Sequence, residues 1–220
     1  MGQAPQAIAG THEAGTVEAP AGHPGFRDCL AMPPGRYAHL LDDVGSDLDA
    51  QLAKTLQDYK AGRYQQASKR FVQLKAAQGF AADLPLIQQL AVLSEAQAPM
   101  LIFELLFLLT GNDTTLEDSF WPYLDTIACF DPDDAIGHGA LYNVLILFAL
   151  RRSDSSMAER LCQLADEAYA RCGSDYLRGF VHMHRALLSV YEGRLDAALA
   201  AIGLAAGFFG ATAQAECEQA

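Results

Sequence analysis

The feature that most constrains this fold is a helix–turn–helix signature whose clearest copy begins at Gly62. Gly62 and Arg63 are followed by Tyr64, by a small residue at Ala67 and by an aromatic residue at Phe71. Glycine permits a tight turn after a first helix, and the small alanine lets a second helix approach that helix closely. The aromatic ring one turn later fills the space beside the alanine. The spacing therefore predicts two packed helices joined by a short turn.

The same punctuation recurs along the chain. Taking 62, 111, 153 and 193 as equivalent turn positions gives a repeat period of about 40–49 residues. Between the turns, apolar residues recur close to the period of a helix with one buried face. We therefore predict an all-α fold, an α-α superhelix of about four degenerate helix pairs. The expected pairs are 47–60 with 64–78, 98–110 with 115–129, 134–151 with 155–172, and 175–192 with 195–208, and a ninth helix over 84–96 fills the longest gap.

The two ends of the chain differ from this periodic middle. Residues 1–45 are rich in Ala, Gly and Pro and sustain no helical period, so we expect a disordered or irregular N-terminal segment. The helical domain is expected to span residues 46–210. Residues 211–220 are polar and close to the chain end, which favours a frayed tail.

Charge and cysteine content argue against several classes of function. With 27 acidic and 15 basic residues the formal net charge is −12, and so acidic a surface repels phosphate backbones. We expect no direct nucleic-acid partner. The five cysteines contain no Cys-x-x-Cys pair and are odd in number, so we expect no disulfide framework, no metal and no cofactor. Reduced thiols suit a cytoplasmic protein.

Hydropathy argues against a membrane partner. The N-terminus lacks a charged segment followed by an apolar stretch, so no signal peptide is predicted. The two most apolar windows singled out are 100–110 and 140–150, each eleven residues long. A membrane span needs about 20 apolar residues, so we interpret both windows as buried helices.

The signature beginning at Gly62 resembles the middle of a tetratricopeptide repeat. From residue 111 onward, the long helix pairs and above all residues 191–199, Tyr-Glu-Gly-Arg-Leu-Asp-Ala-Ala-Leu, are similar to the helical-repeat region of LuxR-type, maltose-regulator-like bacterial transcriptional activators. The resemblance implies a sensor or scaffold that binds an inducer or a partner protein. The sequence contains neither the basic recognition helix nor the Gly-x-x-x-x-Gly-Lys-Ser/Thr loop of those activators, so DNA binding and ATP use are not implied.

Candidate chemistry is sparse. His182 and His184 are two residues apart and so point about 200° apart on a helix, which disfavours a shared metal ion. We expect one of them to face a groove and the other a neighbouring helix. The acidic residues within 131–134 resemble the start of a calcium loop, but the twelfth position is Tyr142 instead of Glu, so capping carboxylates are the better interpretation. No Gly-x-Ser-x-Gly signature occurs, and we expect no catalytic residues and no enzyme.

The remaining candidate is a concave groove lined by the first helix of each pair. Carrying the repeat pattern over by register predicts ten groove residues: Leu56, Tyr59, Lys60, Asn143, Leu147, Arg151, Phe180, Met183, Leu187 and Tyr191. Their mixture of apolar and polar side chains suits an amphipathic helix, an extended peptide or a small amphiphile. We expect a protein- or peptide-binding repeat module with a regulatory or signalling role in a bacterium. The alternative is a small-molecule sensor domain, which a deep closed pocket would favour, and an enzyme is the least expected.

Overall fold

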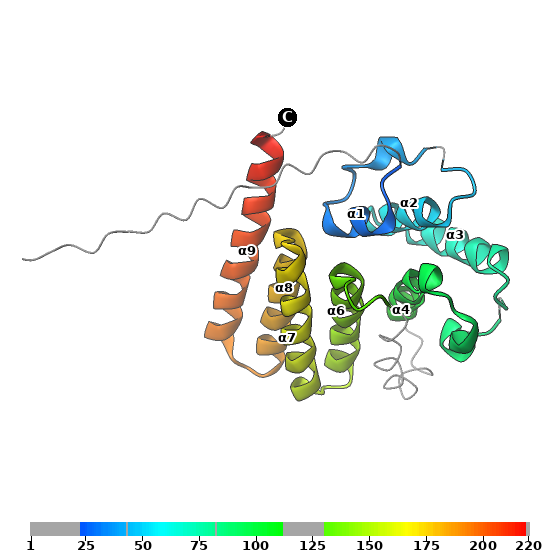
Figure 1. The fold of residues 1–220 in the computed structure, drawn as a ribbon. Coiled ribbons are helices and arrows are strands. Elements are labelled where there is room, and N and C mark those ends of the chain that lie inside the picture. Colours follow the sequence, from blue (N-terminus) through cyan, green and yellow to red (C-terminus); the bar gives the residue numbers. More distant parts are fainter. Residues whose placement is uncertain (1–22, 43, 82, 112–129, 219–220) are drawn as a thin grey trace, which may run out of the picture.

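The computed structural model of the chain describes residues 23–42, 44–81, 83–111 and 130–218. All regular elements within these residues are helices, which confirms the all-α fold class. The four helices α6 to α9 stand side by side, and α1, α2 and α3 cross them at one end of the molecule (Figure 1). Helix α9 forms the outer edge of this row.

The helix bounds lie close to those that periodicity predicts. The first pair is α2 (Leu48–Lys60) with α3 (Tyr64–Ala77), and α4 (Pro99–Gly111) follows. The later pairs are α6 (Ala135–Arg151) with α7 (Ser155–Cys172), and α8 (Asp175–Tyr191) with α9 (Leu195–Glu218). The helix predicted over 115–129 lies outside the described residues.

Helix starts are fixed by side-chain caps. The carboxylate of Asp47 accepts a hydrogen bond from the backbone N–H of the third residue of α2. Asp134, Asp154 and Ser174 accept the equivalent bond at the starts of α6, α7 and α8. Each cap satisfies one of the backbone N–H groups that a helix leaves without an internal partner.

The turns inside the three described pairs share one geometry. Gly62, Ser153 and Gly193 adopt left-handed backbone angles, with φ of 76°, 58° and 72°. In each turn the next residue donates its N–H to a carbonyl five residues earlier, at 2.8 to 2.9 Å. This bond pattern closes a helix with a left-handed residue, which glycine adopts without strain. Three of the four predicted turn positions therefore have the same local structure. The remaining position, 111, is the last described residue before the gap at 112–129.

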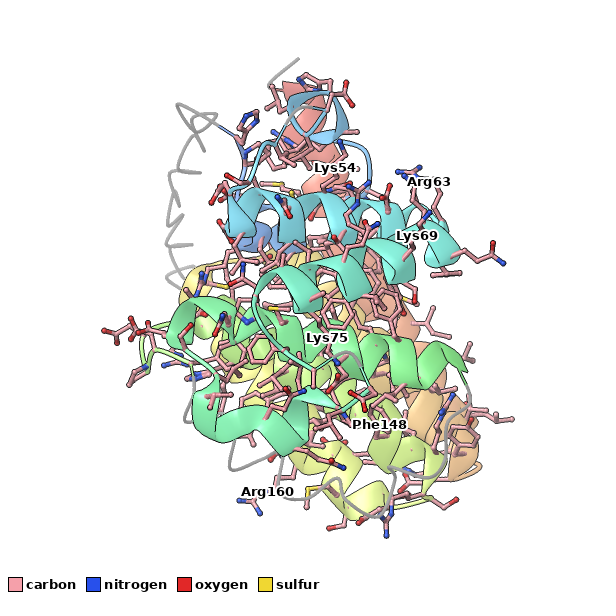
Figure 2. The ribbon with its side chains drawn as sticks, turned by 90° about the vertical axis from the view of Figure 1, so that its right-hand side faces the viewer. Lys54, Arg63, Lys69, Lys75, Phe148 and Arg160 are labelled. Atoms are coloured by element: carbon pink, nitrogen blue, oxygen red, sulfur yellow. The ribbon has the colours of Figure 1, made fainter. Side chains whose placement is uncertain are left out.

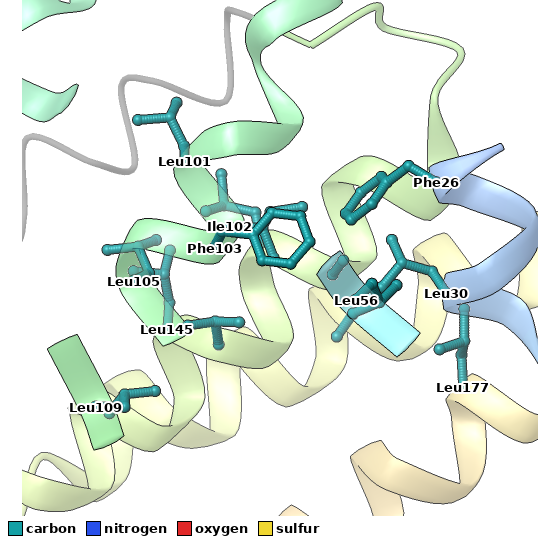
Figure 3. Close-up of a cluster of buried hydrophobic side chains, with 14 of the residues drawn as sticks. Phe26, Leu30, Leu56, Leu101, Ile102, Phe103, Leu105, Leu109, Leu145 and Leu177 are labelled. Atoms are coloured by element: carbon teal, nitrogen blue, oxygen red, sulfur yellow. The ribbon is translucent and has the colours of Figure 1, made fainter. Parts of the chain in front are cut away.

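One continuous hydrophobic core joins the two ends of the described chain (Figure 3). Phe103 of α4 lies against Phe26, with ring centroids 5.4 Å apart, and against Phe71 of α3, at 5.8 Å. Leu145 of α6 and Leu177 of α8 extend the same cluster. The core therefore lies where α1, α3 and α4 meet the later pairs.

Part of the segment predicted to be disordered or irregular is a helix. Within residues 1–45, α1 (Phe26–Ala31) buries Phe26 and Cys29 completely. The ammonium group of Lys60 donates hydrogen bonds to three carbonyls at the end of α1, at 2.7 to 3.0 Å. Six residues are too few to display a helical period, and so short a helix is stable only through tertiary contacts. Periodicity alone therefore could not reveal α1.

The ninth helix predicted over 84–96 is wrong in type. This segment forms two 3₁₀ helices, Leu86–Val92 and Glu95–Gln97. A buried ion pair between Lys75 and Glu104, 3.1 Å long, fixes its entry. Glu104 accepts the backbone N–H of Leu86 at 2.6 Å, and Lys75, labelled in Figure 2, donates to the carbonyl of Leu84. The chain is held by these two side chains, and periodicity could not anticipate them.

The last helix is longer than predicted. We expected α9 to end at residue 208 and residues 211–220 to fray, but α9 continues to Glu218. The added residues are mostly Ala, Gln and Glu, which favour helix, and the hydroxyl of Thr212 bonds the carbonyl of Phe208 without breaking the helix. The polar composition of residues 211–218 is thus compatible with a continuous helix.

Candidate interaction surface

The predicted groove residues of α2 make contacts within the fold and do not line an open groove. Leu56 is buried in the core, and the ring of Tyr59 packs edge-on against Tyr64 and Phe107. Burial lowers the pKa of Lys60 to about 8, and its ammonium lies against the carbonyls that end α1. Lys60 is thus covered by α1, which the helical period does not reveal, and Tyr59 is covered by residues of α3 and α4.

The predicted groove residues of α6 are largely occupied by contacts within the fold. The amide oxygen of Asn143 lies within hydrogen-bonding distance, 2.9 Å, of Nδ1 of His184 on α8. Leu147 is partly buried against the core. Arg151 is exposed, but its guanidinium donates to the carbonyl of Leu109 at the end of α4. Helices α4 and α8 therefore share this face of α6.

The predicted groove residues of α8 behave differently. Phe180 is partly buried, edge-on to the rings of Tyr176 and Phe209. Met183, Leu187 and Tyr191 are exposed to solvent. Only this part of the predicted set forms an open apolar surface, at the end of α8 that leads into α9.

Helices α8 and α9 reproduce the contacts of α6 and α7 at the interval that separates Ser153 from Gly193, which we call one repeat. Gly139 of α6 lies against the buried ring of Tyr169, so close that a Cβ there would be 2.3 Å from the ring. Gly179 of α8 lies in the same way against the ring of Phe209, with a Cβ distance of 2.6 Å. A glycine on the first helix thus allows an aromatic residue on the second to approach its backbone in both pairs.

The two pairs differ in what covers their outer faces. On α6 and α7, Leu150 is 7% exposed and Cys162 is 0% exposed. The positions one repeat later, Val190 and Ile202, are 49% and 51% exposed. Helix α8 lies on the first face, whereas no helix in the described part of the chain lies on the second. We call this second surface the α8–α9 face and define it by Met183, Leu187, Val190, Leu199 and Ile202.

Helix α9 is unusually apolar for an exposed helix. Its segment Leu195–Gln214 is long and apolar enough, by length and composition, to cross a membrane, and a single charged residue, Asp196, lies in it. The many Ala and Gly residues of this stretch make it less apolar than windows 100–110 and 140–150, so it does not stand out by hydropathy. Helices that are apolar on all sides are normally buried by protein or lipid.

The electrostatics of α8 are those of a packed helix. Asp166 of α7 lies 3.0 Å from Arg178 and 3.3 Å from Arg185, and these two guanidinium groups hold its pKa below the usual range against the opposing effect of burial. Burial lowers the pKa of His184 to about 4. Each of these groups connects α8 to the preceding pair, so they define how one helix docks on a pair in this protein.

The histidine and aspartate candidates have structural partners. His182 stacks on Phe208 of α9, with ring centroids 5.2 Å apart, and His184 faces α6, so both histidines face neighbouring helices and neither lines a groove. Burial lowers the pKa of His182. Asp134 caps α6 and pairs with Arg27 at 2.6 Å, and these bonds lower its pKa although burial opposes them. Among the described residues, no three His, Cys, Asp or Glu side chains gather to hold a metal ion.

The described part of the chain forms several concave spaces. One, of about 680 Å³, lies between the start of α7 and the end of α8 and is lined mainly by charged and polar side chains such as Glu159, Arg160 and Arg194. It is shallow and open to solvent, unlike the enclosed apolar pockets that take small molecules.

No family model, curated protein or solved structure matches the chain.

Proposed function

We propose that this chain is a protein-binding helical repeat module that takes a helix of a partner on its α8–α9 face. The observation that carries the proposal is the difference in exposure at equivalent positions. Leu150 and Cys162 are buried under α8, and their counterparts one repeat later, Val190 and Ile202, are half exposed. A face built to receive a helix in one pair is thus repeated, uncovered, in the next.

The proposal follows from how stacked helix pairs are stabilised. A repeat cannot bury its apolar face alone and depends on a neighbour that covers it. Here the α8–α9 pair presents Leu199 and Ile202 to solvent. Exposed contiguous apolar surface of this kind marks a site of interaction with another macromolecule.

The mode of binding is helix in groove. An apolar stripe on a partner helix would contact Met183 and Leu187 on one side and Ile202 on the other, as α8 does on the preceding pair. Such a module binds without catalysing a reaction, and we place it in the cytoplasm as a regulatory or signalling scaffold, in line with its resemblance to tetratricopeptide repeats and to the repeat region of LuxR-type activators.

Site-specific photo-crosslinking tests this function. A photo-crosslinking residue is introduced at Met183, on the face, or at Glu167, which is also exposed but lies on α7 away from the face. Each variant is produced in the cells from which the chain derives. We expect discrete protein adducts from position 183 and none of the same mass from position 167. Identical adducts from both positions, or no adduct from position 183, would contradict the proposal.

A further inference from the structure

We propose that the occupant of the α8–α9 face is a second copy of this chain, docked about a two-fold axis with its α9 antiparallel to the first. This inference rests on the proposed function and names the partner of the same face. It follows from the charge pattern of the face, from the distribution of large and small side chains along α9, and from the extent of the apolar surface.

The charge pattern excludes an occupant like α8. On α7, Glu159 and Asp166 face α8 and pair with its arginines, the closest contact being 3.0 Å. The equivalent positions on α9, one repeat later, are Leu199 and Ala206. The same face that selects a basic helix in one pair is therefore uncharged in the next. Its occupant must present an apolar and uncharged contact surface, since an unpaired charge buried there would be strongly unfavourable.

The chain itself carries such a surface. Its net charge is −12, so two copies repel one another unless they meet through an uncharged region. Within Leu195–Gln214 the single charge is Asp196, near the start of the helix. In an antiparallel pair the two copies of Asp196 lie at opposite ends of a contact ~30 Å long, well beyond the ~10 Å over which salt leaves charges unscreened. The antiparallel helix dipoles also attract.

Side-chain sizes along α9 are self-complementary in the antiparallel direction. Helical spacing places six exposed residues on one stripe, large at its start and small at its end: Leu195, Leu199, Ile202, Ala206, Gly210 and Ala213. Pairing two copies about a centre near residue 204 sets Ile202 against Ala206 and Leu199 against Gly210. A Cβ at Gly210 would meet nothing in its own chain, so the space beside it is available to a large side chain of the partner.

The surface is large enough for a stable dimer. The apolar segment Leu195–Gln214 is ~30 Å long, and the exposed flank of α8 adjoins it. Specific dimers of standard size bury ~800 Å² on each partner, the area of a strip ~27 Å wide along this segment. A lipid surface fits less well, because α9 has no Lys or Arg between residues 195 and 218 and helices that lie on membranes are usually rich in both.

Sedimentation equilibrium of the full chain tests the inference with two matched variants. Ile202 lies on the proposed interface, and Leu204, 55% exposed, lies on the opposite flank of the same helix. We expect the unmodified chain and Leu204→Glu to be dimers at ~10 µM, and Ile202→Glu to weaken dimerisation at least tenfold while keeping its helical circular dichroism. A monomeric chain at this concentration, or equal effects of the two variants, would overturn the inference.

The adduct formed from position 183 separates this inference from the proposed function. An adduct with the mass of two copies supports both. A monomeric chain that crosslinks to a different protein overturns the second-copy proposal and leaves the binding function intact. A monomeric chain without adducts overturns both. Co-flotation with phosphatidylcholine vesicles that Ile202→Glu abolishes would assign the face to a membrane and would also overturn both.

Discussion

The pairs α6–α7 and α8–α9 have the same turn geometry and the same contact between a glycine and an aromatic ring. The equivalent face is nevertheless buried in the first pair and exposed in the second. Cys162 is fully buried under α8, and Ile202, its counterpart, is half exposed. Helices α6 and α9 are both apolar on nearly all sides, but α6 is enclosed by α4, α7 and α8 and α9 is packed mainly against α8. Equivalent local structure therefore does not imply equivalent surroundings, because the burial of a face depends on which neighbouring helix packs against it.

The largest expected effect comes from comparing Leu150, which is buried, with Val190, the exposed residue at the equivalent position one repeat later. Leu150→Ala removes a core side chain and leaves a cavity, so we expect the free energy of unfolding to fall by about 3 kcal/mol. Val190→Ala, one repeat later, is expected to change it by less than about 0.5 kcal/mol in dilute solution. Urea denaturation of both variants measures the difference. Equal losses would show that the α8–α9 face is already covered in the free chain.

Acidification tests how α8 docks on α6. Burial lowers the pKa of His184 from 6.5 to about 4, so between these values the unfolded chain binds a proton that the folded chain excludes. The contribution of neutral His184 to the free energy of unfolding is fully present above pH 6.5. It is lost as the pH falls, by about 2 kcal/mol at pH 4.5.

Urea denaturation between pH 7 and pH 4.5 measures this loss. His184→Gln is expected to flatten the pH profile in this range more than His182→Gln does. The carboxylates of Asp134 and Asp166 have pKa values below 3.8 and act at lower pH. A profile unchanged by His184→Gln would contradict the buried neutral histidine.

Glycine substitutions compare the two close approaches. Gly139→Ala places a methyl group against the fully buried ring of Tyr169, and we expect a loss of about 1.5 kcal/mol. Gly179→Ala meets Phe209, which is partly exposed and can move, so its loss is expected to be smaller. Gly203→Ala on α9 meets nothing and is expected to stabilise the helix by about 0.5–1 kcal/mol. Thermal melting ranks the three, and a stabilising Gly139→Ala would remove the proposed equivalence.

The smallest effect concerns the turns. Ser153 has a left-handed φ of 58°, which costs energy for a residue with a Cβ, whereas Gly193 adopts 72° freely. We expect Ser153→Gly to stabilise the chain and Gly193→Ser to destabilise it, each by about 0.5–1 kcal/mol. Chemical denaturation curves of both variants provide the measurement. Changes of the same sign would mean that the two turns are not equivalent.

The sequence by itself determined most of the local structure within the described helix pairs. The turn residues Gly62, Ser153 and Gly193, the capping residue Asp154 and the helical period set where helices start and stop, because capping and backbone conformation depend on residues a few positions apart. The sequence also shows the interval between the last two helix pairs. The same glycine-to-aromatic contact is made in both pairs by residues at that interval.

Only the tertiary structure decided which of the predicted surfaces are open. Lys60 was predicted to line a groove, but its ammonium group donates hydrogen bonds to carbonyls at the end of α1, a helix too short to show a period. The apolar sides of α6 and α9 look alike in the sequence, because hydropathy records what a helix would bury and contains no information on which neighbour is present. Met183 and Leu187 are exposed because no helix in the described part of the chain packs over them.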